Sequence, residues 1–193
     1  MIRRLLFLTL AFIGLTACGS TPETRSSEMV QAQEADKEAR RALRDGQLLR
    51  AQRGFNKVLV LQQSQDNVSG SATTMVNLAT VAHQLKEHDA ALTWLDRIVM
   101  ENPNIYPVEL QLIAAFRKSV MLADLSRIGE ADSSLKIAER LCDKSCTQKL
   151  GLDVLRARLL LLNGNIKDAL SLAQTVSSNS AAGMSEQANA LRI

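Results

Sequence analysis

Apolar positions along the chain recur with two periods, one within each helix and one along the whole sequence. Four alanines lie 38 to 40 residues apart, and each is followed by apolar residues four and seven positions later: Ala51, Ala91, Ala131 and Ala169. Positions i, i+4 and i+7 share one face of an α-helix, so each alanine marks the start of an amphipathic helix. Its small side chain is expected to let a neighbouring helix approach closely.

A second helical pattern precedes each of these phrases, separated from it by a short polar or glycine-containing turn. The predicted pairs are 28–45 with 48–63, 71–86 with 88–101, 108–127 with 129–141, and 148–162 with 166–176. Short connections place consecutive helices side by side and antiparallel. The sequence therefore predicts four helix hairpins, which we number as units one to four.

Local departures from the pattern carry further expectations. The first helix, 28–45, is rich in alanine and charge, so we predict a lightly buried cap. The polar stretch 62–70 predicts a loop, either a binding loop or a spacer. The run 159–162 consists of four leucines, which predicts a helix buried between neighbours on both sides. Residues 183–193 form another helical stretch, either an end cap or part of a fifth repeat.

This arrangement resembles the tetratricopeptide (TPR) repeat. The best match runs from Gly70 to Pro103, with Leu78 and Ala79 in the first helix, Ala91 early in the second, and the closing proline at a repeat length of about 34 residues. In the other units the spacing is longer than in the TPR consensus, and the positions that are aromatic in the consensus are mostly aliphatic or alanine. Over residues 28–176 the resemblance implies an all-α fold: a right-handed superhelical array, a TPR-like α-solenoid of about four units plus a C-terminal helix.

TPR arrays bind extended peptides or partner helices in a concave groove lined by the first helix of each unit. The resemblance therefore implies a candidate groove made of Asn77, Thr80, Val81, Gln84, Arg117, Lys118, Asp124 and Arg156. Amides and guanidinium groups at such positions suit a peptide backbone or a carboxylate. The alternative is that each of these is an ordinary exposed polar residue.

The amino terminus has the pattern of an export signal. Arg3 and Arg4 precede an apolar run, 5–15, that is too short to span a bilayer. Leu15-Thr16-Ala17-Cys18 resembles the lipobox of bacterial lipoproteins, which implies that the Cys18 thiol is acylated and that Cys18 begins the mature chain. The expected domains are a signal peptide (1–17), a lipidated flexible tether (18–27) and the repeat domain (28–193). An ordinary signal peptide or a signal anchor is the alternative.

Gly19 follows the lipobox cysteine, where enteric lipoproteins kept in the inner membrane carry aspartate. The resemblance therefore implies a lipid anchor in the outer membrane, on its periplasmic face, in preference to the inner membrane. Several acyl chains, each CH₂ contributing about 0.8 kcal/mol, would make this anchor effectively permanent.

Two cysteines remain after this assignment, Cys142 and Cys146, and an oxidising periplasm favours a disulfide between them. On one unbroken helix their Cβ atoms would be about 5–6 Å apart, whereas a disulfide needs about 3.5–4.5 Å. We therefore predict that the helix ends between them. The alternative of a metal or redox site lacks a nearby histidine or a third thiol.

Composition narrows the function further. Aromatic residues make up 3% of the chain, and Arg3 and Arg4 contribute two of the net +3 charges. No basic cluster is interleaved with aromatics, so no nucleic-acid partner is expected. No phosphate-binding glycine loop, Gly-x-Ser-x-Gly motif or metal-spaced histidine pair occurs, so we expect no enzyme, cofactor or metal.

These patterns together predict a membrane-anchored periplasmic adaptor that binds envelope proteins or peptides in the groove of its repeats. By resemblance to other lipoproteins with such arrays, pilus or secretion-system assembly is the preferred setting. The alternatives are regulation of peptidoglycan synthesis, outer-membrane protein assembly, or, in another class, a ligand-capturing lipoprotein. The last would need an aromatic-rich pocket, which the composition disfavours.

Overall fold

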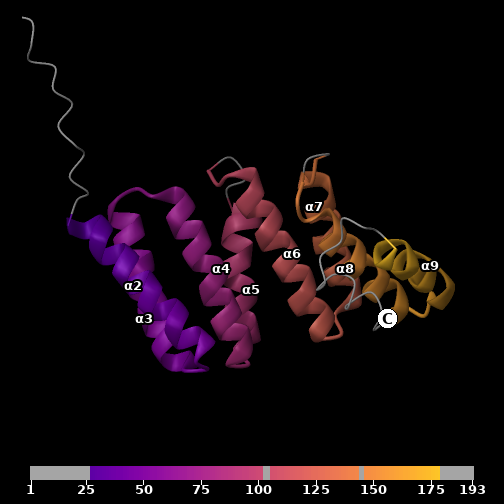
Figure 1. Ribbon diagram of the computed structural model, residues 1–193, viewed down its shortest axis with the longest axis horizontal. Helices are drawn as coiled ribbons and strands as arrows, with labels where there is room; N and C mark the ends of the chain where they lie inside the picture. The colour runs from indigo at the N-terminus through magenta and orange to yellow at the C-terminus, as the bar shows by residue number, and fades with distance from the viewer. Residues whose placement is uncertain (1–26, 102–104, 144–145, 179–193) are drawn as a thin grey trace, which may run out of the picture.

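The computed structural model describes residues 27–101, 105–143 and 146–178. Its helices are α2 (Ser27–Arg44), α3 (Leu48–Ser64), α4 (Val68–Gln84), α5 (His88–Asp96), the π-helical continuation η2 (Arg97–Glu101), α6 (Val108–Asp124), α7 (Ile128–Leu141), α8 (Lys149–Leu162) and α9 (Ile166–Ser177). They form hairpins that follow one another along the molecule, from α2–α3 at one end to α8–α9 at the other (Figure 1). The all-α array of four units is confirmed.

Several predicted features lie outside the described residues. These are the signal peptide 1–17, Cys18 with nearly all of its tether, and the helical stretch 183–193. Ser27, assigned to the tether, is the first residue of α2. Among the helices that are described, none combines the length and the apolar character needed to cross a bilayer.

One turn geometry recurs between the helices. The residue that ends the turn has a positive φ, whether it is glycine, as at Gly46 (72°), or not, as at Lys86 (67°) and Ser126 (58°). After Gly46 the N–H of Gln47 donates to the carbonyl of Ala42 at 2.8 Å, the long bond of a Schellman motif. Because the same bond repeats at the other turns, each hairpin closes with the same geometry.

The loop predicted over residues 62–70 is wrong. α3 extends to Ser64 and α4 begins at Val68, so only three residues separate the first two units. Asp66 takes the positive φ of the recurring turn, and the Asn67 side chain accepts a 2.9 Å hydrogen bond from the N–H of Gly70, which caps α4. The stretch has Val68 as its one apolar residue because two exposed helix ends meet there.

The repeated alanines are buried between helices, in line with the prediction. Ala51, Ala91 and Ala131 are 0% exposed and Ala169 is 1% exposed. The residues four and seven positions later are buried as well, and they form the apolar face of each second helix. In unit three the buried Ser119 hydroxyl donates to the carbonyl of Ala131 at 2.7 Å, a polar link within the same contact.

Each second helix also packs against the first helix of the following unit: α3 against α4, α5 and η2 against α6, and α7 against α8. The first helices contact one another in turn, α4 against α6 and α6 against α8. The first helices of units two to four therefore share one continuous side of the array.

The two ends of the described array differ from its middle. α2 buries only Ala32, Ala39 and Ala42, which agrees with the predicted light cap. At the other end Leu159 is 3% exposed but Leu162 is 47% exposed. The prediction that 159–162 is buried on both sides is wrong at Leu162, because no described helix lies beyond it.

Two glycines inside helices allow a matched test of helix packing. A Cβ on Gly54 of α3 would lie 2.8 Å from the Cβ of Ala39 on α2, whereas a Cβ on Gly129 of α7 would meet nothing within 4 Å. We expect Gly54→Ala to lower the free energy of unfolding by about 1–3 kcal/mol through overpacking. Gly129→Ala should leave it unchanged or raise it by up to about 1 kcal/mol. Urea unfolding followed by circular dichroism measures both, and equal effects would contradict the tight α2–α3 contact.

Candidate functional site

The exposed side of the first helices is the candidate binding surface, which we call the first-helix face. Helical spacing places one set of half-buried or exposed residues along it. Its members are Thr73, Asn77, Thr80 and Gln84 of α4, Ile113, Phe116, Arg117, Val120 and Asp124 of α6, and Gly151, Val154 and Arg158 of α8. Five of the eight predicted groove residues therefore share this face.

Val81 does not belong to this surface. It is 0% exposed, together with its neighbours Ala79 and Ala82 at 0% and 1%. α4 is packed against α3, α5 and α6, so apolar residues cover a wide sector of its surface. Val81 lies inside this buried sector, whereas Thr80, the residue before it, lies on the solvent-facing side. The prediction that Val81 lines a groove is wrong for this reason.

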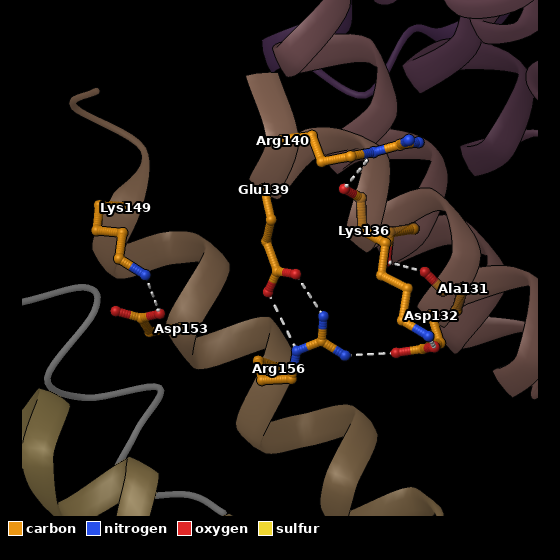
Figure 2. Close-up of polar contacts among 9 residues, drawn as sticks. Ala131, Asp132, Lys136, Glu139, Arg140, Lys149, Asp153 and Arg156 are labelled. Atoms are coloured by element: carbon orange, nitrogen blue, oxygen red, sulfur yellow. Dashed lines mark hydrogen bonds and ion pairs between the residues drawn. The ribbon is translucent and has the colours of Figure 1, made fainter. Parts of the chain in front are cut away.

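Lys118 and Arg156 are also misplaced by the sequence prediction. They occupy the same position in their units, and both point to the second helix of the preceding unit rather than to the first-helix face. The Lys118 ammonium pairs with Asp96 of α5. Arg156 lies between Glu139 and Asp132 of α7, as Figure 2 shows, and its Nε donates to Oε1 of Glu139 at 3.1 Å. Both cations therefore hold consecutive units together.

The contacts around Arg156 shift the pKa of Asp132 and the pKa of Arg156 itself. Bonding to Lys136, and after it to Arg156, holds the pKa of Asp132 below its ordinary value, although partial burial opposes this. Burial disfavours the charge of Arg156, but its bonds to Glu139 and Asp132 outweigh that cost and raise its pKa. Asp132 and Arg156 are therefore both ionised at neutral pH.

Asp124 connects three units through the first-helix face. Its carboxylate accepts a 2.7 Å bond from Arg158 of α8, and it lies 3.4 Å from Nε2 of His83 on α4. The Nδ1 atom of His83 is in turn 3.4 Å from Nδ1 of His88, the first residue of α5. Asp124 is therefore on the predicted surface, but its carboxylate is already engaged within the array.

Two of the predicted residues keep exposed polar groups for a partner, and a third has a buried amide without a partner. Arg117 and Gln84 are exposed, and Nδ2 of Asn77 makes no hydrogen bond although it is shielded from solvent. Thr80 lies between Asn77 and Gln84 on α4, but its hydroxyl donates to the carbonyl of Val76 at 3.0 Å. A guanidinium and one amide are thus exposed on the first-helix face, and the unpaired Nδ2 of Asn77 lies buried within it.

Phe116 is a further member of this surface that the predicted groove did not include. It is half-buried, one residue from Arg117, and its ring lies 3.5 Å from where a Cβ on Gly151 of α8 would be. A Cβ there would make an ordinary van der Waals contact, so the ring lies directly beside Gly151. Ile113 and Val120 flank it on the same side of α6, so an apolar patch adjoins the guanidinium of Arg117. No local sequence signal links Phe116 to a glycine in another unit.

Cys142 and Cys146 are joined by a disulfide, with their Cα atoms 5.2 Å apart. α7 ends at Leu141 and α8 begins at Lys149, so both cysteines lie in the connection between units three and four. Across the described ranges, His, Cys, Asp and Glu residues form no group of three or more that could hold a metal ion.

Comparison with solved structures identifies the architecture. A crystal structure of nearly identical TPR-like repeats, from a protein of Podosopora anserina described as a kinesin light chain, aligns with a TM-score of 0.65 at 16% identity, covering 84% of this chain and 85% of that chain. The fold is a TPR-like α-solenoid. A second crystal structure of those repeats gives a TM-score of 0.63 at 17% identity, covering 84% and 86%.

Comparison of the sequence with family models and with curated proteins found no match. No family model matches the chain, and no curated protein matches it. Its repeat period of 38 to 40 residues also exceeds the roughly 34 residues of the TPR consensus. The likeness therefore lies in how the helices pack rather than in the identity of their residues.

The Arg156 network should make the stability of the solenoid depend on acid pH. Because the folded pKa of Asp132 is lowered, its stabilisation is present above its ordinary pKa of about 3.9 and is lost as the pH falls through the folded value. We expect Arg156→Met to lower the free energy of unfolding at pH 7 by about 1–3 kcal/mol. This difference from the wild type should shrink below about pH 4, where Asp132 takes up a proton in the unfolded chain, and should be lost as the pH falls through the lower folded pKa.

Lys149→Met is the matched control, because Lys149 is 64% exposed and pairs only within its own helix, with Asp153. Its loss should cost about 0.3–0.5 kcal/mol. Urea unfolding of the three proteins between pH 3 and 7 measures both effects. A difference for Arg156→Met that stays constant over this range would show that the ion pairs contribute nothing to it.

Proposed function

We propose that this protein is a non-catalytic adaptor that binds another protein on its first-helix face while a lipid on Cys18 holds it at a membrane. The observation that carries the proposal is the combination of Arg117, Asn77 and Phe116. The first has an exposed guanidinium, the second a buried amide nitrogen without an internal hydrogen bond, and the third a half-buried ring. These are the groups with which proteins bind peptide backbones, carboxylates and apolar anchors.

The extent of the surface favours a chain-like ligand over a small molecule. The first-helix face crosses three units, and its polar groups are spread from α4 to α8 around the apolar patch of Ile113, Phe116 and Val120. An extended peptide or a partner helix contacts such a surface at several points, with main-chain groups giving affinity and side-chain contacts giving specificity.

The ion pairs between units support the same function. Lys118 with Asp96, and Arg156 with Asp132 and Glu139, join neighbouring units through half-buried charges, and Asp124 joins α6 to α8 through Arg158. These contacts restrict the relative movement of the helices that form the face. A surface ordered before binding loses less conformational entropy when a partner binds, which favours affinity.

The cellular setting of the proposal rests on the lipobox resemblance at Cys18. From this resemblance we infer a location on the periplasmic face of the outer membrane, where the adaptor would bind components of an envelope-assembly system. Pilus or secretion-system assembly is our preferred setting. Peptidoglycan synthesis and outer-membrane protein assembly are other settings in which the same surface would act, and the identity of the bound partner distinguishes them.

The proposed surface can be tested by crosslinked pull-down from bacterial envelopes. We expect the Asn77→Ala/Arg117→Ala variant to recover the specific partner at about one tenth of the wild-type yield, which corresponds to a loss of roughly 1.4 kcal/mol of binding free energy. The readout is the amount of partner relative to bait by quantitative mass spectrometry.

The Arg140→Ala/Asn163→Ala variant is the control, because it removes the same two residue types from exposed positions away from the first-helix face. It should retain the partner at full yield. If the first variant retains the partner equally well, the binding surface lies elsewhere on the solenoid.

The lipid anchor has a separate test. Cys18→Ser should abolish incorporation of radiolabelled palmitate and move the protein from the membrane fraction to the soluble fraction, since the thiol is the proposed acylation site. Cys142→Ser/Cys146→Ser is the cysteine control and should keep both the label and the membrane fractionation. Palmitate labelling that persists in Cys18→Ser would exclude the lipoprotein assignment while leaving the first-helix face untouched.

A further inference from the structure

Exposed apolar side chains gather at one edge of the array. The helices of units one to three run back and forth between two edges. The turns within the hairpins lie at one, which we call the turn edge, and the start of α2 and the connections between units lie at the other, the connection edge (Figure 1). Large apolar side chains that are 37% to 65% exposed lie at the connection edge or within about one helical turn of it, and we call them the connection-edge row: Met29, Val30, Val60, Val68, Met100, Ile105 and Val108.

This exposure is one-sided. Val68 and Val108 are the first residues of α4 and α6, and Met100 is the residue before the last of η2. Among the described residues of units one to three, Leu49 is the one large apolar side chain that is exposed near the turn edge. The turn edge instead presents charged residues such as Lys86. Apolar surface is therefore concentrated where the units connect.

The chain enters the described structure at the same edge. α2 begins at Ser27, and the proposed acylation site, Cys18, precedes it by nine residues. Even fully extended, nine residues span only about 30 Å. α4, with 17 residues, is about 25 Å long. A lipid on Cys18 therefore holds the connection edge close to a bilayer, while the turn edge lies a helix length away from the connection edge.

The charges beside the row indicate which lipid surface it suits. Exposed carboxylates stand next to its members: Glu28 precedes Met29, and Glu109 follows Val108. Anionic lipids attract segments rich in lysine and arginine, so these carboxylates oppose an electrostatic attraction to them. Apolar side chains can instead enter the boundary between headgroups and acyl chains without help from charge. The row therefore suits a zwitterionic bilayer.

We propose that the connection edge rests on the lipid bilayer, with the connection-edge row inserted at the boundary between the headgroups and the acyl chains of zwitterionic lipids. The inference rests on the proposed lipid at Cys18, which confines the chain to the membrane, and it adds a second contact made by the fold itself. Insertion at several points sets an orientation that a single anchor leaves free. The helices then stand upright on the membrane, and the first-helix face opens sideways toward a partner.

A quencher carried by the lipid tests this contact in the full acylated chain. Met100→Cys and Val108→Cys each introduce one thiol for a fluorescent label, since Cys142 and Cys146 are bonded to each other and Cys18 is acylated in the proposal. In phosphatidylcholine vesicles with a doxyl group on part of the acyl chains, both labels should lose most of their emission. Leu49→Cys is the matched control: Leu49 is 58% exposed on α3 near the turn edge, and its label should keep its emission.

The outcomes separate this contact from the anchor. Vesicle-bound protein with labels at Met100 and Val108 quenched no more than the label at Leu49 would overturn the bilayer contact and leave the anchor intact. Wild-type protein that neither incorporates palmitate nor floats with the vesicles would overturn both. Quenching that requires phosphatidylglycerol in the vesicles would contradict the apolar basis of the contact. Labels that escape the lipid quencher but crosslink to another envelope protein would assign the row to a protein partner instead.

Discussion

The packing of each second helix against the first helix of the next unit is the contact on which this protein depends. A hairpin closed around an alanine such as Ala91 buries one side of each helix, but its first helix carries apolar residues on another side as well. Leu78 and Leu95, 2% and 0% exposed, are buried because helices lie on more than one side of them. Stability therefore comes from stacking, and a single unit has too little core of its own.

Charge reinforces the same junctions. Lys118 and Arg156 occupy equivalent positions and bind carboxylates of the preceding second helix in two successive junctions. Exposed ion pairs contribute little to stability, but these cations are only 18% and 24% exposed, and Arg156 satisfies two carboxylates at once. Their directional bonds also define how far one unit is rotated relative to the next, which apolar contacts alone specify less sharply.

The placement of these cations decides which residues are left for recognition. Groups that bind the neighbouring unit belong to the scaffold, and the first-helix face keeps the exposed guanidinium of Arg117, the unpaired amide of Asn77 and the exposed part of the Phe116 ring. The proposed adaptor combines this surface with an anchor that precedes α2 in the chain. A lipid at the amino terminus and a binding surface along the first helices would let the protein hold a partner near the membrane without occupying the anchor.

The fold was predictable because its determinants are local. The spacing of Ala51, Ala91, Ala131 and Ala169, with the apolar residues that follow each one, identified the second helices and the turns before them. The segment 62–70 was misread because two solvent-exposed helix ends meet there, and polar helix ends show no apolar period. Leu162 was misread because an apolar run predicts a covered helix and does not say which element covers it.

The sequence by itself determined that this protein is an array of helix hairpins, since helical periodicity and turn residues act within a few positions of the chain. Only the tertiary structure decided that Arg117 faces outward while Lys118 binds Asp96, and that Arg156 braces two units instead of lining the first-helix face. Consecutive residues on a helix point about 100° apart. Whether a cation meets solvent or a carboxylate therefore depends on the helix packed beside it, which lies tens of residues away in sequence.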